Sequence, residues 1–86
     1  MQSGDLDTIT GGQIRAARGL LRWSADELAE RSRLGVATIR RAEAQDGPVS
    51  ITPANANAIK QAFERAGIEF IPENGGGVGL RLKAKG

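Results

Sequence analysis

The stretch from residue 23 to residue 43, WSADELAERSRLGVATIRRAE, constrains the fold most, because its pattern predicts two short amphipathic helices joined by a tight turn. Ser24 and Glu27 form a capping-box motif, which satisfies free backbone N–H groups at a helix start. A three-residue interruption that ends at Gly35 separates the two helices. Helices this short bury little surface alone, so we expect them to cross steeply over a shared small residue, Ala29.

The rest of the chain adds two longer helical patterns and one alternating pattern. Thr10 and Thr52 precede apolar residues at helical spacing and are the expected N-caps of these helices. Residues 68–83 alternate in polarity around a turn rich in Asn and Gly, which is typical of a β-hairpin. The expected fold is mainly α, with helices at 11–22, 25–32, 36–45 and 53–66 and a C-terminal hairpin.

The expected organisation is one small domain of 86 residues. It divides into a flexible leader (1–9), a helical domain (10–67), the hairpin (68–83) and a frayed tail (84–86). A two-stranded hairpin alone is marginally stable in water. It must therefore pack on the helices, or pair with a second copy or with a partner strand.

Composition argues against several classes of function. The chain has no Cys and no His, so disulfides, imidazole catalysis and the common zinc sites are not expected. The carboxylates of Asp26, Glu27, Glu30 and Glu43 fall on predicted helix surfaces, so we expect no enzyme, no cofactor and no metal site. No apolar run approaches the ~20 residues that span a bilayer, and the first residues do not resemble a signal peptide. The expectation is a cytoplasmic protein without membrane contact.

The segment from residue 10 to residue 66 resembles the Cro/repressor-type (XRE-like) helix-turn-helix family of small bacterial and phage regulators. The resemblance rests on QIRAARGLLRWS, on ELAERSRLGVATIRRAE and on a last helix that ends in IKQAFERAG. The small residue of the family's first motif helix is commonly alanine, here Ala29. The apolar positions of the motif are matched by Leu28, Leu34 and Ile39. The resemblance implies a four-helix domain whose second motif helix, about 36–45, enters the major groove of DNA.

The resemblance also implies a set of DNA-binding residues. They are Arg33, Val36, Ala37, Thr38, Arg40 and Arg41. The three residues from Val36 to Thr38 would face the bases, and the first two of them offer only apolar contacts, for example to thymine methyl groups. Arg40 and Arg41 would contact phosphates or one guanine, with Arg33 beside them. The implied partner is operator DNA, bound by a homodimer on a palindrome, with the hairpin as the dimer edge.

Two residues depart from the family pattern. Arg33 stands in the turn where glycine is usual, so it must adopt a left-handed conformation at a cost of roughly 1 kcal/mol, or the turn must rearrange. Ala25 stands where a glutamine often bonds to phosphate.

These departures support a second function. The apolar Val36 and Ala37, the missing glutamine and a net charge of only +2 suit a helix-turn-helix that binds protein instead of DNA. Such a chain would sequester a transcriptional activator as an antiactivator or adaptor. An exposed hairpin edge, which can accept a strand from a partner, also suits this alternative.

Overall fold

The computed structural model describes residues 9–72 and 75–83, and within them the chain forms four α-helices and a two-stranded antiparallel sheet. The predicted mainly α architecture with a hairpin is confirmed. The expected leader, up to residue 8, and the expected tail, 84–86, lie outside the described residues. The elements are α2 (Gly11–Leu21), α3 (Ala25–Ser32), α4 (Val36–Ala42), α5 (Pro53–Arg65), β1 (Ile68–Ile71) and β2 (Gly79–Leu82).

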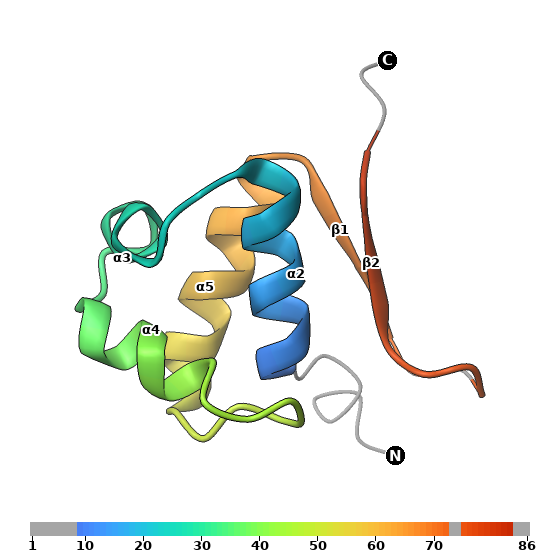
Figure 1. Cartoon of the computed structure of the whole chain (residues 1–86), viewed down its shortest axis with the longest axis horizontal. Coiled ribbons are helices and arrows are strands. Elements are labelled where there is room, and N and C mark those ends of the chain that lie inside the picture. Colours follow the sequence, from blue (N-terminus) through green and yellow to red (C-terminus); the bar gives the residue numbers. More distant parts are fainter. Residues whose placement is uncertain (1–8, 73–74, 84–86) are drawn as a thin grey trace.

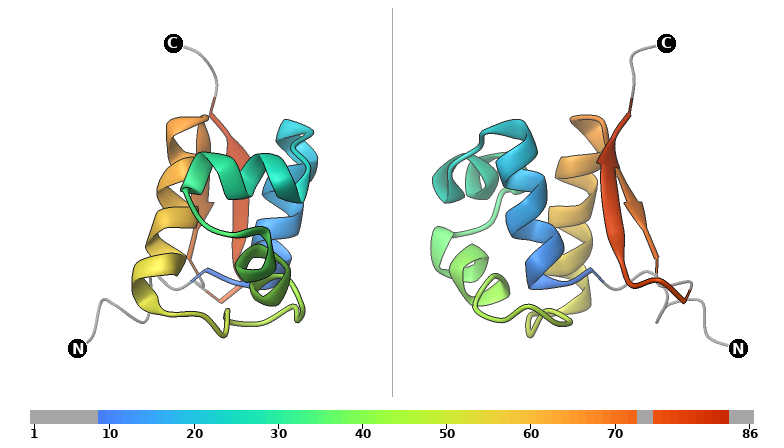
Figure 2. Two further views of the ribbon diagram at one scale, coloured as in Figure 1. Left: turned by 90° about the vertical axis from the view of Figure 1, so that its left-hand side faces the viewer. Right: turned by 45° about the vertical axis from the view of Figure 1, so that its right-hand side comes forward.

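The elements are arranged in three layers. Helices α3 and α4 lie on one side, α2 and α5 form the middle, and the hairpin covers the opposite side (Figure 1). Figure 2 shows α3 lying across α2 and α5, with α4 below it. Strand β2 lies against α2, and β1 against α5. The hairpin is thus held on the helices, on the side away from α4.

The predicted N-caps define the helix starts. The Oγ1 atom of Thr10 accepts a hydrogen bond from the Gln13 backbone N–H at 3.0 Å, and the Gln13 side chain accepts one from the Thr10 N–H at 2.9 Å. These two reciprocal bonds form a capping box, which satisfies free N–H groups at the start of α2. Thr52 caps α5 by accepting a single hydrogen bond from the Asn55 N–H, with Pro53 at the first helical position.

Helix α4 ends at Ala42, three residues before the predicted end at 45. The following residues bend under the start of α2. There the carbonyls of Asp46 and Gly47 accept bonds from the first two N–H groups of α2, at 3.2 and 2.9 Å. The loop approaches so closely that a Cβ on Gly11 would lie 1.9 Å from the carbonyl oxygen of Gln45. The loop after α4 thus caps the start of α2 through long-range contacts that local helix propensity does not encode.

The hairpin forms in the predicted region, with Ile68 paired to Leu82 and Ile71 paired to Gly79. Its turn includes Gly75 and Gly77, both with the positive φ expected of glycine there. On the helix side Ile68 is buried and Phe70 meets Phe63 of α5 edge to face, at 6.0 Å between ring centroids.

The hydrophobic core lies between the two helical layers and extends to the hairpin. Its largest fully buried side chains are Phe63, Ile14, Leu28, Ile39, Ile59 and Ile68. Ile9 belongs to this core as well, although the sequence analysis assigned it to the leader. It is 2% exposed, and its carbonyl accepts a hydrogen bond from Val49. The hydrophobic core therefore includes a residue that precedes the first helix.

Candidate nucleic-acid interface

Helices α3 and α4 are joined by a three-residue connection whose geometry follows from local sequence. Ser24 starts α3 by accepting a hydrogen bond from the Glu27 N–H at 3.0 Å. Arg33 ends it in the left-handed conformation, with φ 62° and ψ 38°. The next N–H, of Leu34, then reaches back to the Ala29 carbonyl at 2.9 Å. Of the two alternatives for this turn, the strained arginine is the one observed.

Buried apolar residues hold α4 against α3. Ala29 on α3 is 7% exposed, and Ile39 and Ala42 on α4 are fully buried. The two helices are in extensive contact. This packing occupies one side of α4 and leaves its other side at the molecular surface.

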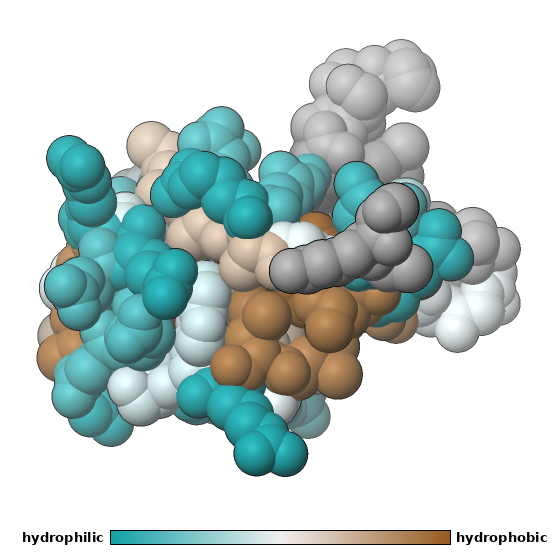
Figure 3. All heavy atoms as spheres, turned by 90° about the horizontal axis from the view of Figure 1, so that it is seen from above, coloured by the Kyte–Doolittle hydropathy of each residue, from teal (hydrophilic) through white to brown (hydrophobic). Residues whose placement is uncertain are grey.

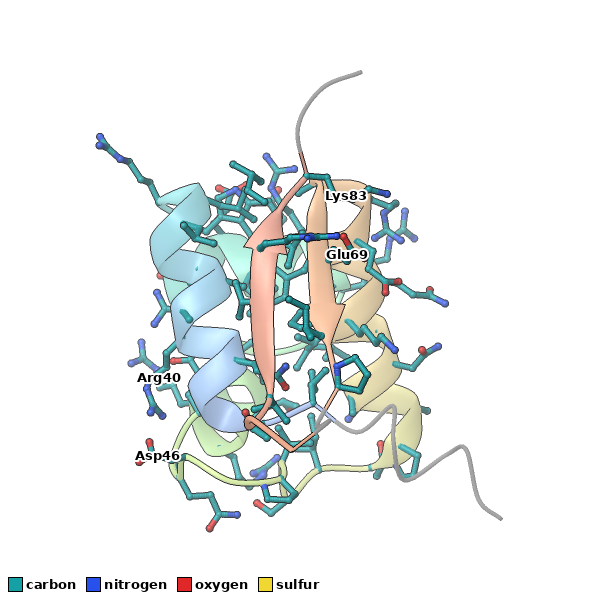
Figure 4. All side chains as sticks on the ribbon, turned by 90° about the vertical axis from the view of Figure 1, so that its right-hand side faces the viewer. Arg40, Asp46, Glu69 and Lys83 are labelled. Carbon is teal, nitrogen blue, oxygen red and sulfur yellow. The ribbon has the colours of Figure 1, made fainter. Side chains whose placement is uncertain are left out.

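The six predicted site residues differ in their exposure to solvent. Ala37, Arg40 and Arg41 are exposed on α4, and Arg33 is exposed just before it. Figure 4 shows Arg40 at the periphery of the molecule, away from the hairpin residues Glu69 and Lys83. Thr38 is half-buried. Val36 is also half-buried and packs against the core, which restricts its access to a base edge.

Several charged side chains near α4 are engaged in ion pairs. Arg15 binds Asp46 of the following loop, and it also donates to the carbonyl of Glu43 at 2.7 Å. Arg31 binds Glu27 one turn earlier on α3.

The pair between Arg18 and Glu43 is the most enclosed of these, with side chains 24% and 11% exposed. Two guanidinium nitrogens of Arg18 donate to the two carboxylate oxygens of Glu43, at 2.7 and 3.0 Å. A third donates to the Trp23 carbonyl at 2.9 Å. The hydrogen bond to Glu43 raises the pKa of Arg18 above its ordinary value. The pair fixes the end of α4 to α2 and neutralises the carboxylate closest in sequence to Arg40 and Arg41.

The arginines around α4 differ from those on α2 and α3. The side chains of Arg33, Arg40 and Arg41 form no hydrogen bond or ion pair within residues 9–72 and 75–83. A chain with nearly balanced charge therefore presents unpaired positive charge along α4 and at the turn before it. Such a distribution suits contacts with phosphates more than the small net charge suggests.

Sequence reasoning missed two features that shape this surface. Arg18 and Glu43 lie 25 residues apart, and no local pattern connects them. Trp23 stacks on Phe63 of α5 at 5.5 Å, and the Arg31 guanidinium lies 4.5 Å from the Trp23 ring centroid. In the sequence, Trp23 and Arg31 are merely eight residues apart, and that spacing does not by itself indicate a cation–π contact.

No group of three or more Asp, Glu, His or Cys side chains that could hold a metal ion is found in the described part of the chain. None of its helices has the length and apolarity to cross a bilayer. No protein-family model matches the sequence, and no curated protein matches it significantly.

Proposed function

We propose that this chain is a bacterial or phage transcriptional regulator of the Cro/repressor kind, and that α3 and α4 are its helix-turn-helix. In this proposal α4 enters the major groove of double-stranded operator DNA in the cytoplasm. One observation carries the proposal. The exposed side of α4 consists of Ala37, Arg40 and Arg41, while Glu43 at its end is held by Arg18.

Each side chain has a role in this arrangement. Arg40 and Arg41 bind phosphate oxygens or a guanine edge, and Arg33 binds the backbone beside the groove. Ala37 contacts base edges and offers a thymine methyl group an apolar surface. Val36 anchors α4 to the core. Because it packs there, it contributes little to the recognition of base edges.

The same observation weakens the alternative function. A protein-binding α4 requires an apolar centre to be desolvated against its partner. With Val36 half-buried and packed on the core, Ala37 is the one exposed apolar side chain of α4. Arginines make up the rest of the exposed surface of this helix, which favours DNA over an activator protein as its target.

Binding of fluorescent duplex DNA by the wild type and by the Arg40→Gln/Arg41→Gln variant, over a series of salt concentrations, tests the proposal. Removal of both charges should weaken binding to every sequence by roughly tenfold or more at low salt. The slope of log K against log salt should fall by about one for each phosphate that the variant no longer neutralises.

A control with the same net charge is Arg22→Gln/Lys83→Gln, since both side chains are exposed and neither lies on α4. It should bind DNA nearly as the wild type does. A variant with a longer polar side chain, Ala37→Gln, should change the preferred sequence while keeping the salt slope. If the Arg40/Arg41 variant binds DNA as tightly as the wild type at low salt, α4 is not the DNA-reading helix.

A further inference from the structure

A polar pocket lies between the end of α3 and the exposed side of α5. Its volume is about 530 Å³, which is within the size range of small-molecule sites. Its wall on α5 is formed by Ala58, Gln61 and Arg65, which follow one another at intervals of three and four residues and so share a face of the helix. The last turn of α3, with Arg33 after it, forms the opposite wall.

Positive charge is concentrated in this pocket. Arg31, Arg33 and Arg65 line it, and Glu30 is the one carboxylate among its lining residues. Seen from above, hydrophilic side chains predominate on the side of the molecule that carries α3, whereas apolar side chains gather toward the hairpin (Figure 3). Like charges repel one another, and an anion bound between them offsets that repulsion. The distribution of charge therefore favours an anionic ligand.

The three arginines differ in their availability for a ligand. The guanidinium of Arg31 donates to Glu27 at 2.5 Å and lies 4.5 Å from the ring centroid of Trp23. Arg65 donates one hydrogen bond, 3.3 Å long, to the carbonyl of Arg31. The side chain of Arg33 donates none within residues 9–72 and 75–83. Arg33 and Arg65 therefore retain N–H donors for a ligand.

The backbone of Arg33 gives a second reason to expect a ligand here. Its φ is 62°, in the left-handed region where a side chain is strained and glycine is not. Its exposed side chain makes no hydrogen bond in the described part of the chain that could offset this strain. Strained residues gather at ligand sites, where their contacts serve function. A contact with a bound anion gives the arginine such a role.

We propose that this pocket binds a small phosphorylated molecule of the sugar phosphate or nucleotide class. The guanidinium groups of Arg33 and Arg65 donate to the phosphate oxygens, a pairing in which arginine forms two parallel hydrogen bonds. The Gln61 side chain, exposed on the same face of α5 as Arg65, donates a further bond. The carboxylate of Glu30 accepts a bond from a hydroxyl group on the remainder of the ligand.

Occupancy of the pocket opposes DNA binding. This part of the inference rests on the proposed function, in which Arg33 binds the DNA backbone. The same guanidinium cannot bind two phosphates with all of its donors, and the bound anion also adds negative charge beside the turn that precedes α4. Such coupling is reciprocal, so DNA weakens binding of the small molecule by the same factor. The phosphorylated molecule thus acts as an effector that releases the chain from DNA.

The first test is calorimetric titration of the wild type, without DNA, with inorganic phosphate and with ribose 5-phosphate at constant ionic strength. We expect one site per chain and tighter binding of ribose 5-phosphate. Arg65→Gln should weaken binding of both probes at least about tenfold. Arg65 is exposed, so this variant should retain the helical circular dichroism spectrum. Arg81→Gln, which removes an exposed arginine of the hairpin, has the same net charge and should bind as the wild type does.

The second test changes the charge of the pocket in both directions. Gln61→Glu adds a carboxylate of nearly the same shape and should weaken binding of inorganic phosphate. Glu30→Gln removes the carboxylate and should strengthen binding of inorganic phosphate, while it narrows the preference for ribose 5-phosphate. Glu69→Gln on the hairpin changes the net charge as Glu30→Gln does and should leave both affinities unchanged.

The third test separates a free phosphorylated molecule from a phosphate of the DNA backbone. Saturating ribose 5-phosphate should lower the affinity of the wild type for duplex DNA by about fivefold or more at constant ionic strength. The same addition should have no effect on DNA binding by Arg65→Gln. The proposal is overturned if neither probe binds without DNA while Arg65→Gln lowers the salt slope of DNA binding by about one, because the pocket then holds a DNA phosphate.

Other outcomes would also overturn the proposal. Equal binding of inorganic phosphate by the wild type and by Gln61→Glu would place the anion elsewhere. Equal affinities of the wild type for the two probes would exclude a sugar phosphate as the ligand. A chain that binds neither probe, but whose DNA binding depends on Arg40 and Arg41, would retain the proposed DNA-binding function. A chain that binds ribose 5-phosphate in this pocket, but no DNA, would retain the site and lose that function.

Discussion

The pair of Arg18 and Glu43 offers a quantitative test of how α4 is held. Arg18→Met removes both hydrogen bonds to Glu43 and the one to the Trp23 carbonyl, and it keeps an unbranched apolar side chain. It leaves a carboxylate that is 11% exposed without its partner. Exposed ion pairs contribute about 0–1 kcal/mol, whereas breaking a buried pair costs about 3–5 kcal/mol. For this intermediate exposure we expect a decrease of about 2 kcal/mol in the free energy of unfolding.

The assay is urea denaturation followed by the fluorescence of Trp23, which stacks on Phe63 of the core. With an m value of about 1 kcal/mol/M, the midpoint should fall by about 2 M urea. The control is Arg81→Met, which breaks the exposed pair with Glu69, whose two side chains are 67% and 43% exposed. That change should cost less than about 1 kcal/mol.

A variant that changes both residues of the pair completes the test. The variant Arg18→Met/Glu43→Leu replaces the pair by two apolar side chains, and it should be more stable than Arg18→Met alone. Equal midpoint shifts for Arg18→Met and Arg81→Met would refute the reasoning, because enclosure of the pair would then have no energetic consequence.

Three further changes test the packing and the backbone. Ala29→Leu should cost about 1–3 kcal/mol in urea denaturation, because it forces α3 and α4 apart, and an unchanged midpoint would mean that they do not meet there. Gly11→Ala should lower the melting temperature more than Gly19→Ala does, since its Cβ would lie 1.9 Å from a carbonyl oxygen whereas Gly19 has open space. Arg33→Gly should raise the unfolding free energy by about 0.5–1 kcal/mol relative to Arg33→Ala, because glycine adopts the left-handed conformation without strain; equal stabilities of these two variants would contradict this account of the turn.

The sequence predicted features that depend on residues close together in the chain. Thr10, Ser24 and Thr52 mark helix starts because each hydroxyl bonds to an N–H three residues later. The hairpin was predictable from alternation and from its turn glycines. The left-handed conformation of Arg33 was one of two alternatives that the family resemblance left open, and it is the one the structure has.

Contacts distant in sequence decided the candidate site. Val36 belongs by pattern both to the buried side of α4 and to the expected reading residues, and only packing against the core showed which contact dominates. Helix α4 ends at Ala42, and the loop after it caps α2. Ile9 follows a polar segment and is nonetheless buried.

The distribution of charge shows most clearly which features depend on local sequence and which depend on tertiary contacts. From sequence alone, residues 15–41 hold seven arginines and three carboxylates, and each arginine is equally available for a partner. The tertiary structure brings Arg18 to Glu43 and Arg15 to Asp46, and leaves Arg40 and Arg41 without a partner in the described part of the chain. Helix periodicity and capping act within a few residues, so the sequence determined which helices form. Ion pairing and burial depend on which surfaces meet, so only the tertiary structure decided which charges remain available for a ligand.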